Sequence, residues 1–304
     1  MCGELYERES IMKIVITGAD GQLGGDCKEV LKRNFEIVPL ELNDLDITNM
    51  PFADKLIGEI APQIILNCAA YTNVDDCETK RDLAWKVNVE GPRNLAVVAN
   101  TLGARLVHIS SDYVFDGRKE VPEPYTETDK ANPISYYGVT KSESEGAVRG
   151  ATDNYVILRT AWMYGIQGQN FLRTMLNLAL KDPKREIKVV NDQFGSPTWT
   201  YRLARQIAGL IESGGQGTYH ATSEGYCTWY ELATDFLDKM GVPHLFVPCS
   251  TEEYPTPAQR PINSILENKC LKESGLNLMK DWKSDLDEYV VRFRERLIKQ
   301  SKGI

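Results

Sequence analysis

Lys13-Ile14-Val15-Ile16-Thr17-Gly18-Ala19-Asp20-Gly21-Gln22-Leu23-Gly24 is the segment that decides the fold class. Its first part is rich in β-branched apolar residues and predicts a buried strand, and a helix is expected to follow it through about Arg33. Glycines at 18, 21 and 24 permit a tight turn, close approach of the backbone to a pyrophosphate, and close packing of helix on strand. The helix then presents its free N–H groups and positive dipole end to that phosphate. We therefore expect a dinucleotide-binding loop formed by Gly18, Gly21, Gln22, Leu23 and Gly24.

The same alternation of strand and helix continues through the first half of the chain. Strands are expected at residues 13–17, 35–40, 63–68, 105–110 and 155–159. Helices are expected at residues 51–59, 82–102 and 136–149. Apolar strands separated by helices are typical of a parallel sheet covered on both faces. Residues 12–165 are thus predicted to form a dinucleotide-binding domain of the α/β class, a doubly wound parallel sheet of the Rossmann type.

The pattern is less regular after residue 165. Helices are expected at 171–180, 201–211 and 228–240, with a short strand at 218–221 and a final helical segment that ends near residue 299. A proline-rich loop containing Pro255, Pro257 and Pro261 precedes that last segment. We expect residues 166–304 to form mainly a smaller C-terminal substrate-binding lobe, with some elements returning to the main sheet. Residues 1–11 are predicted to be an N-terminal extension.

The composition indicates which kinds of partner the protein has and in which compartment it is expected. A net charge of -8 disfavours nucleic acid as the main partner, so any anionic ligand must be held by a local site. The seven cysteines are odd in number and form no Cys-x-x-Cys pair, which indicates reduced thiols in a cytoplasmic protein and no zinc site. No apolar run is long enough to cross a membrane, and the N-terminus lacks the apolar core of a signal peptide.

An acidic residue follows the second expected strand. Glu41 stands 20 residues after Gly21, where a carboxylate can accept hydrogen bonds from the adenosine ribose and would repel a 2′-phosphate. NADH is therefore favoured over NADPH. Asp44 and Asp46 remain alternative candidates for this role, and Asp46-Ile47 is expected to lie beneath the adenine.

Tyr137 and Lys141 lie four residues apart on an expected helix and so share one face. A free phenol is a weak acid at neutral pH, and a nearby ammonium is expected to lower its pKa and so make it a better proton donor. An isolated Tyr-x-x-x-Lys is more often an ordinary surface pair. Ser110-Ser111, however, ends the fourth strand, and ligands bind at the carboxyl ends of parallel strands. A hydroxyl there can hydrogen-bond a substrate carbonyl, so Ser111, Tyr137 and Lys141 are the predicted catalytic residues.

Several longer motifs resemble the extended short-chain dehydrogenase/reductases and, within them, the dTDP-4-dehydrorhamnose reductase family. The resemblance covers nearly all of the chain after Met12. It is carried by these stretches: Gly21-Gln22-Leu23-Gly24, Asp46-Ile47-Thr48-Asn49, Asn67-Cys68-Ala69-Ala70-Tyr71-Thr72-Asn73-Val74-Asp75, Ser110-Ser111-Asp112-Tyr113-Val114-Phe115-Asp116-Gly117, Arg159-Thr160-Ala161-Trp162-Met163-Tyr164-Gly165, Asp192-Gln193-Phe194-Gly195-Ser196-Pro197-Thr198 and Arg260-Pro261.

This resemblance implies a reaction and a set of roles. Hydride passes from NADH or NADPH to the 4-keto group of dTDP-6-deoxy-L-lyxo-4-hexulose, giving dTDP-L-rhamnose, with Tyr137 as proton donor. Lys141 binds the nicotinamide ribose, and Ser111, Asp112 and Trp162 contact the sugar. The resemblance also places Ala69, Ala70, Tyr71 and Thr72 along the cofactor. Serine stands at 111 where the family usually has threonine, which keeps the hydroxyl and loosens the rotamer.

Other interpretations remain open. A sugar-nucleotide dehydratase would need a second carboxylate after the strand-end hydroxyl, where Tyr113 stands. A reductase or epimerase of another nucleotide-activated 4-keto-6-deoxysugar is compatible with the motifs, and a non-catalytic NAD(P)-binding regulatory subunit less so.

Single residues also allow two roles. Arg260 is expected either to hold the substrate's diphosphate or to form a surface salt bridge. Trp199 and Trp229 either line the sugar pocket or pack in the lobe, and His108 is expected in the core. Some family members are homodimers that bind magnesium through surface carboxylates; we match no such carboxylates here and predict no metal site.

Overall fold

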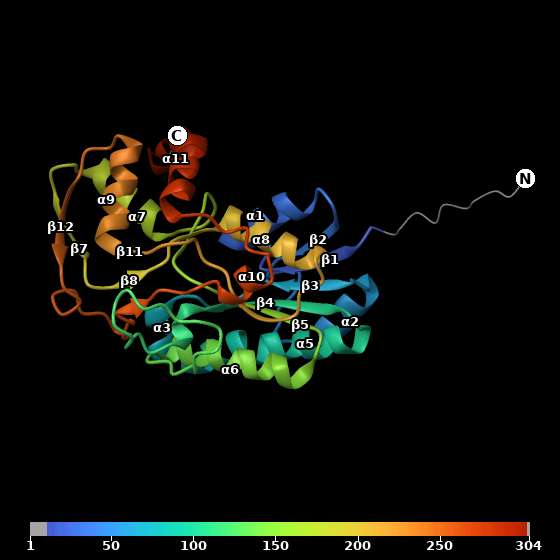
Figure 1. Ribbon diagram of the computed structural model, residues 1–304. Helices are drawn as coiled ribbons and strands as arrows, with labels where there is room; N and C mark the ends of the chain where they lie inside the picture. The colour runs from blue at the N-terminus through green and yellow to red at the C-terminus, as the bar shows by residue number, and fades with distance from the viewer. Residues whose placement is uncertain (1–10, 303–304) are drawn as a thin grey trace, which may run out of the picture.

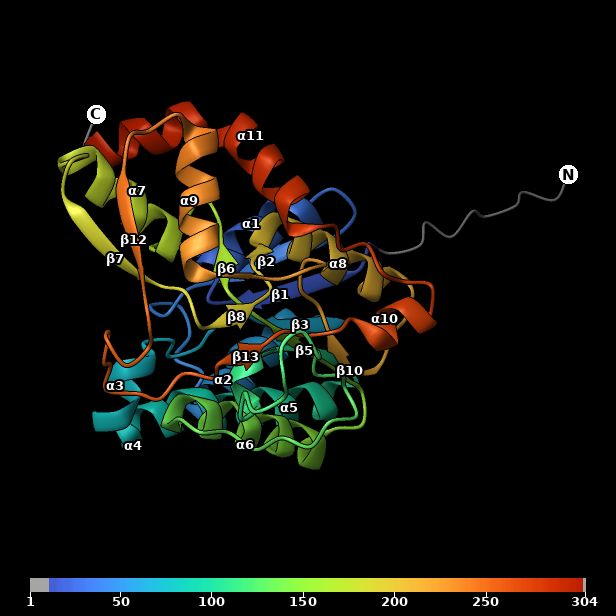
Figure 2. The same ribbon diagram turned by 60° about the vertical axis from the view of Figure 1, so that its left-hand side comes forward.

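The computed structural model describes residues 11–302, so that the predicted extension, apart from Ile11, lies outside the described residues. A central sheet carries helices on both faces, and a lobe built by the second half of the chain sits over one end of it (Figure 1). Figure 2 shows the same layers from another direction, with α5 and α6 below the sheet and α1 and α8 above it.

Six parallel strands form the central sheet, in the order β10-β5-β4-β3-β1-β2. They are β1 (Lys13–Thr17), β2 (Glu36–Leu40), β3 (Ile64–Asn67), β4 (Arg105–Ser111), β5 (Tyr155–Thr160) and β10 (Gly217–His220). Because β2 and β3 lie on opposite sides of β1, the strand order reverses there, and a crevice for ligands is expected at the carboxyl ends of these strands. Pro39 lies in β2, an edge strand, where a missing N–H is tolerated.

Helices cover the sheet according to the alternation of its side chains. Ile14 and Ile16 face the layer of α1 (Gln22–Leu31) and α8 (Thr200–Glu212), whereas Val15 faces the layer of α2 (Met50–Ile60), α5 (Gly91–Leu102) and α6 (Tyr136–Ala151). Both faces are apolar, as expected for a parallel sheet. The prediction of a doubly wound Rossmann-type sheet is confirmed.

The helix predicted at 82–102 is interrupted. It forms α4 (Arg81–Trp85), a π-helical turn η1 (Lys86–Glu90) and then α5. Pro92, near the start of α5, has no N–H to donate to the preceding turn, and a wider turn relieves that constraint. The interruption holds Asn88 in a buried position, where its side chain bonds the backbone N–H and carbonyl of Tyr71 and the hydroxyl of Thr140.

The lobe has its own apolar core. Its main elements are α7 (Phe171–Lys181), β7 (Glu186–Val190), α9 (Trp229–Met240), β12 (Leu245–Cys249) and α11 (Trp282–Lys302). The short elements of the lobe are β6 (Met163–Tyr164), β8 (Phe194–Gly195), β9 (Thr198–Trp199), β11 (Cys227–Thr228) and β13 (Asn263–Ser264). Outside the lobe, α3 (Val74–Thr79) and η2 (Asp112–Val114) pack against α6, and α10 (Lys269–Glu273) packs against β10. Trp199, Phe236 and Tyr289 are completely buried among the elements of the lobe, and β7 pairs in parallel with β12. Trp199 is thus a core residue of the lobe.

Two elements from the second half of the chain join the sheet layers. β10 pairs with β5, and α8 packs beside α1. A buried ion pair links α8 to α11, since Arg202 Nε lies 2.9 Å from Asp285 Oδ1. Thr200 donates a hydrogen bond to Asp26 of α1. These polar contacts fix the lobe's last helix against the sheet.

Candidate active site

A cavity of about 410 Å³ lies at the carboxyl ends of the central strands. The predicted residues that line it come from the glycine loop, from the end of β4 and the segments that follow β3, β4 and β5, and from the first half of α6: Gly21, Gln22, Leu23, Ala69, Ala70, Thr72, Ser111, Asp112, Tyr137, Lys141 and Trp162. Residues far apart in the chain thus share one site. The remaining predicted residues, Gly18, Gly24, Glu41, Asp46, Ile47, Tyr71 and Arg260, do not line this cavity.

The glycine loop is shaped for close backbone approach. Gly18 has φ of 64°, and a Cβ there would come within 2.8 Å of the backbone of Ala69. A Cβ on Gly24 would overlap the carbonyl oxygen of Gly18. Helix α1 starts at Gln22 after Gly21, with no side chain capping its first N–H groups. This geometry fits a pyrophosphate at the helix N-terminus.

The three acids after β2 differ in their contacts. Asp44 Oδ2 accepts the backbone N–H of Glu41, and Asp46 Oδ1 accepts that of Thr48. Glu41 is partly exposed, and its hydrogen bond with the Asp20 carboxyl raises the pKa of Glu41. Of the three, Glu41 is the carboxylate not held in a local turn.

Two hydrogen bonds orient Ser111 at the end of β4. Its hydroxyl donates to Asp112 Oδ1 at 2.7 Å and accepts from the backbone N–H of Tyr113 at 3.2 Å. A threonine methyl would restrict the side-chain rotamer at this position, and in Ser111 these two hydrogen bonds restrict it instead. The ring of Tyr137 packs edge-on against Tyr113 with 5.5 Å between centroids.

Lys141 is buried below Tyr137. Its ammonium donates to the carbonyl oxygen of Ile109 at 2.7 Å, and burial lowers the pKa of Lys141 to about 8, with the charge of Glu145 opposing that shift. The expected lowering of the Tyr137 pKa by Lys141 is not found. Burial and then the Asp112 charge raise the pKa of Tyr137, and a hydrogen bond with Ser111 counteracts them in part. Tyr137 is therefore protonated at neutral pH.

Asp112 offers an unused acceptor to the cavity. Its side chain is 2% exposed, and Oδ2 has no hydrogen-bond partner among the described residues. Burial raises the pKa of Asp112 to about 6, against the opposing hydrogen bond from Ser111. A buried acceptor without a partner is costly in a folded protein, and a ligand hydroxyl can satisfy it.

Trp162 adopts a strained backbone conformation, with φ of 46°. Its indole stacks on that of Trp229, with 3.5 Å between centroids and 10° between planes, and a Cβ on Gly195 would overlap it. Strained residues of this kind are often found at ligand sites. Trp229 lines this cavity and also a second one of about 570 Å³.

Arg260 lines the second cavity. Two of its nitrogens lie 2.8 and 3.0 Å from the two oxygens of Asp75, which forms a bidentate pair. That cavity also contains Lys188, Gln193 and Tyr254. The salt bridge foreseen as one alternative is present, and the guanidinium still faces a space that a ligand can enter.

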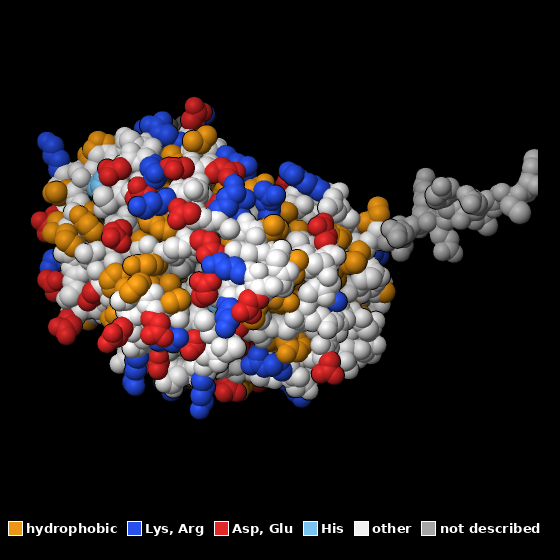
Figure 3. Space-filling view, in the orientation of Figure 1, with side chains coloured by type: hydrophobic (Ala, Val, Ile, Leu, Met, Phe, Trp, Pro, Cys, Tyr) orange, Lys and Arg blue, Asp and Glu red, His pale blue; other side chains and the backbone are white. Residues whose placement is uncertain are grey.

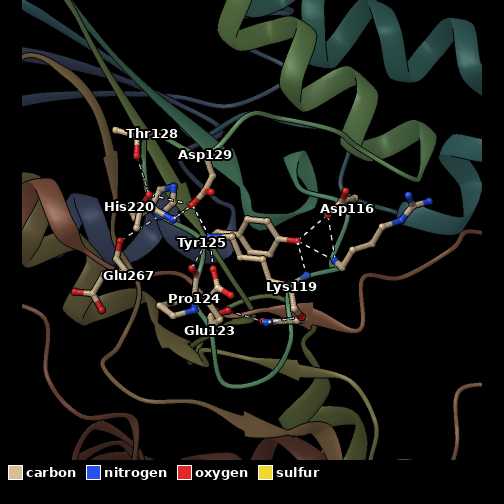
Figure 4. Close-up of polar contacts among 12 residues, drawn as sticks. Asp116, Lys119, Glu123, Pro124, Tyr125, Thr128, Asp129, His220 and Glu267 are labelled. Carbon is tan, nitrogen blue, oxygen red and sulfur yellow. Dashed lines mark hydrogen bonds and ion pairs between the residues drawn. The ribbon is translucent and has the colours of Figure 1, made fainter.

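A polar network fixes the loop that follows Asp112 (Figure 4). Tyr125 donates to Asp116 Oδ1 at 2.7 Å and accepts the backbone N–H of Arg118, while its ring stacks on Phe115 at 4.4 Å. His220 lies at the other side of this cluster and contacts the Phe115 ring edge-on. The loop is thereby held against β10.

Sequence reasoning missed several residues of the site. Tyr113, Thr160 and Gln169 line the first cavity, and Trp229 had been considered chiefly as a packing residue. Tyr113 and Thr160 lie within motifs quoted above, so membership of those motifs was an available signal for them. Tyr71 does not point into the cavity: its hydroxyl donates to Asp76 Oδ2 at 2.9 Å.

Comparisons with known proteins identify the family. The RmlD substrate binding domain family matches residues 12–295. The chain belongs to this family. Three relatives are similar to this chain over most of their length. A dTDP-4-dehydrorhamnose reductase structure from Clostridium acetobutylicum is 45% identical with a TM-score of 0.90, covering 93% of this chain and 100% of that one.

Of the other two relatives, one is a structure in complex with NADP, and the other is named for the reduction of a different dTDP-sugar. A dTDP-4-dehydrorhamnose reductase structure from Bacillus anthracis, in complex with NADP, is 40% identical with a TM-score of 0.90 and covers 93% of this chain and 99% of that one. A dTDP-4-keto-6-deoxy-D-glucose reductase from Streptomyces niveus is 38% identical, with 90% and 95% covered. RmlD-family membership confirms the family that the motifs predicted, and with it an NAD(P)H-dependent oxidoreductase.

The surface and the helices add two observations. On the face in Figure 3, basic and acidic side chains are interspersed and not segregated. Within residues 11–302, no helix is both long and apolar enough to span a membrane.

Proposed function

We propose that this protein reduces the 4-keto group of dTDP-6-deoxy-L-lyxo-4-hexulose with NADH or NADPH, giving dTDP-L-rhamnose. The observation that carries the proposal is a single cavity that joins the glycine loop to Ser111, Asp112, Tyr137 and Lys141. The activities named for the relatives support a dTDP-sugar as the substrate.

The residues of the cavity fit a reduced nicotinamide dinucleotide, which supplies the hydride when bound. The glycine loop and the N-terminus of α1 hold the pyrophosphate, and Lys141 holds the nicotinamide ribose. As the substrate carbonyl oxygen gains negative charge, the Ser111 hydroxyl turns its single hydrogen from Asp112 Oδ1 toward that oxygen, and Tyr137 donates its proton. Its raised pKa keeps Tyr137 in the protonated form that donation requires. Asp112 Oδ2 accepts a hydrogen bond from a sugar hydroxyl.

The two cavities suit the two parts of a sugar nucleotide. The hexose occupies the first cavity beside Trp162, and the nucleoside diphosphate extends past Trp229 into the second. Arg260 and Lys188 line that second cavity and supply positive charge for the diphosphate. We take NADH as the favoured cofactor because, of the three acids after β2, Glu41 is the one whose carboxylate is not held in a local turn. Its hydrogen bond with Asp20 would give way to the ribose hydroxyls.

The decisive experiment is a panel of dTDP-linked 4-keto-6-deoxysugars, assayed by the loss of reduced-nicotinamide absorbance. The L-lyxo sugar should be reduced fastest. Tyr137→Phe should lower turnover by about a hundred- to ten-thousand-fold while the cofactor still binds. Tyr136→Phe removes a neighbouring hydroxyl on the same helix and should leave turnover unchanged.

Two outcomes would separate the alternatives. Turnover of Tyr137→Phe near the wild-type rate would contradict the assigned proton donor. Faster reduction of the D-xylo 4-keto sugar would instead favour the activity named for the Streptomyces niveus relative.

A further inference from the structure

Glu145 is a buried carboxylate that the proposed chemistry does not use. It lies on α6 one turn after Lys141 and two turns after Tyr137, so the three residues share one face of the helix. Its side chain is 1% exposed. A buried charge is retained at a cost unless it is paired and hydrogen-bonded, so its partners indicate its role.

Arg149 of α6 lies 3.3 Å from Glu145 Oε2, and the shorter hydrogen bonds come from the two strands that end at the cavity. Arg159 of β5 donates to Glu145 through Nε at 2.8 Å and Nη2 at 2.7 Å. Ser110 of β4 donates to Glu145 Oε1 at 2.6 Å. Ser110 and Arg159 are directly opposite in the strand register, so both side chains reach the same carboxylate from neighbouring strands.

Lys141, one turn earlier on α6, also bonds the end of β4. Its ammonium bonds the carbonyl of Ile109, the residue before Ser110. Helix α6 therefore bonds β4 at two successive residues, and the next two residues of the chain are the hydrogen-bonded pair Ser111, the last residue of β4, and Asp112. A small shift of α6 relative to β4 would therefore move Ser111, the hydrogen-bond donor to the oxyanion, relative to Tyr137, the proton donor.

We propose that Glu145 is a positioning residue of the active site, which holds the end of β4 and the ammonium of Lys141 in register with Tyr137 through its bonds to Ser110 and Arg159. This inference rests on the proposed function in assigning Lys141 to the cofactor. Glu145 also has an electrostatic effect, since its charge opposes the burial that lowers the pKa of Lys141.

Among the titratable groups around Lys141 and Glu145, Glu145 is the anion whose charge favours the protonated form of Lys141. Burial lowers the pKa of His108 on β4 well below its usual range, and that of His220 on β10 to about 3, so both rings are neutral. The remaining charged or ionisable neighbours are Arg149 on α6, Arg159 on β5, Asp112 after β4, and Tyr137 on α6. Ionised Glu145 is stabilised chiefly by Arg159.

The test compares Glu145→Gln with Glu143→Gln, an exposed carboxylate on the same helix. The alkaline limb is the loss of NADH binding and of turnover as the pH rises. Glu145→Gln should move it to lower pH by about one unit, because Lys141 loses its supporting anion. Turnover should fall at least tenfold with little change in substrate KM. Ser110→Ala keeps the charge and removes the strand contact, so it should lower turnover without moving the alkaline limb.

Two further measurements keep the inference testable. If Glu145→Gln does not fold, Glu145→Gln/Arg159→Met removes the buried pair together and should still move the limb. NADH binding, followed by fluorescence against pH, needs no substrate, so a failure of the proposed reaction would not hide the result. An alkaline limb and turnover equal to those of Glu143→Gln would overturn the inference.

Discussion

At the scale of single residues, Asp112 combines a cost in stability with a role at the site. Burial raises its pKa to about 6, so between about pH 4 and 6 the folded protein holds a proton that the unfolded chain has released. Stability contributed by the protonated form is present below pH 4 and is lost as the pH rises through 6. The loss is at most about 3 kcal/mol, from the size of that shift.

Asp112→Asn should remove this pH dependence. Urea unfolding at pH 4.5 and pH 7.5 would measure it, with those two values chosen to lie at about the two ends of the titration. The wild type should lose more stability than the variant between the two conditions. An equal change in both proteins would mean that Asp112 titrates as an exposed acid. The variant should also bind the sugar nucleotide more weakly.

We predict that Glu41 controls a second residue-scale property, the choice of cofactor. Asp44 and Asp46 are held in local turns, which leaves Glu41 as the acid that can meet the ribose. Glu41→Ala should raise kcat/KM with NADPH relative to NADH, since a carboxylate no longer repels the 2′-phosphate. Asp46→Ala serves as the comparison. A wild type that strongly prefers NADPH would show that Glu41 does not face the ribose.

At the scale of elements, the start of α1 depends on the absence of a side chain at Gly24. A Cβ there would overlap the Gly18 carbonyl, so Gly24→Ala should displace the loop and weaken cofactor binding at least tenfold. Gly58→Ala is the matched control in α2, where a Cβ meets no atom within 4 Å. It should stabilise the protein by about 0.5–1 kcal/mol and leave binding unchanged. Cofactor fluorescence titration and thermal unfolding measure the two effects.

At the scale of the whole molecule, the ion pair of Arg202 and Asp285 joins the lobe to the sheet layers. Asp285→Asn leaves a buried guanidinium with a weakened partner and should lower the free energy of unfolding by about 3 kcal/mol. The exposed pair of Lys239 and Asp287 is the control, and Asp287→Asn should cost less than about 1 kcal/mol. Equal losses in urea unfolding would show that the buried pair does not hold the lobe in place.

The sequence by itself determined the sheet and predicted the residues proposed for the reaction. Residues such as Val15 lie in apolar, β-branched runs, and local steric and hydrophobic preferences place such runs in buried strands wherever the rest of the chain folds. Glycine spacing and the four-residue separation of Tyr137 and Lys141 are likewise local properties. Family membership followed from motifs for the same reason.

Only the tertiary structure decided what depends on burial and on partners distant in the chain. The pKa of Tyr137 rises where the helix pattern predicted a fall, because Lys141 turns to the carbonyl of Ile109 and burial disfavours the phenolate. The interruption of the helix around Asn88 and the meeting of Ser110, Arg159 and Glu145 also needed the fold. Electrostatic energies depend on distance and desolvation in three dimensions, and sequence separation measures neither.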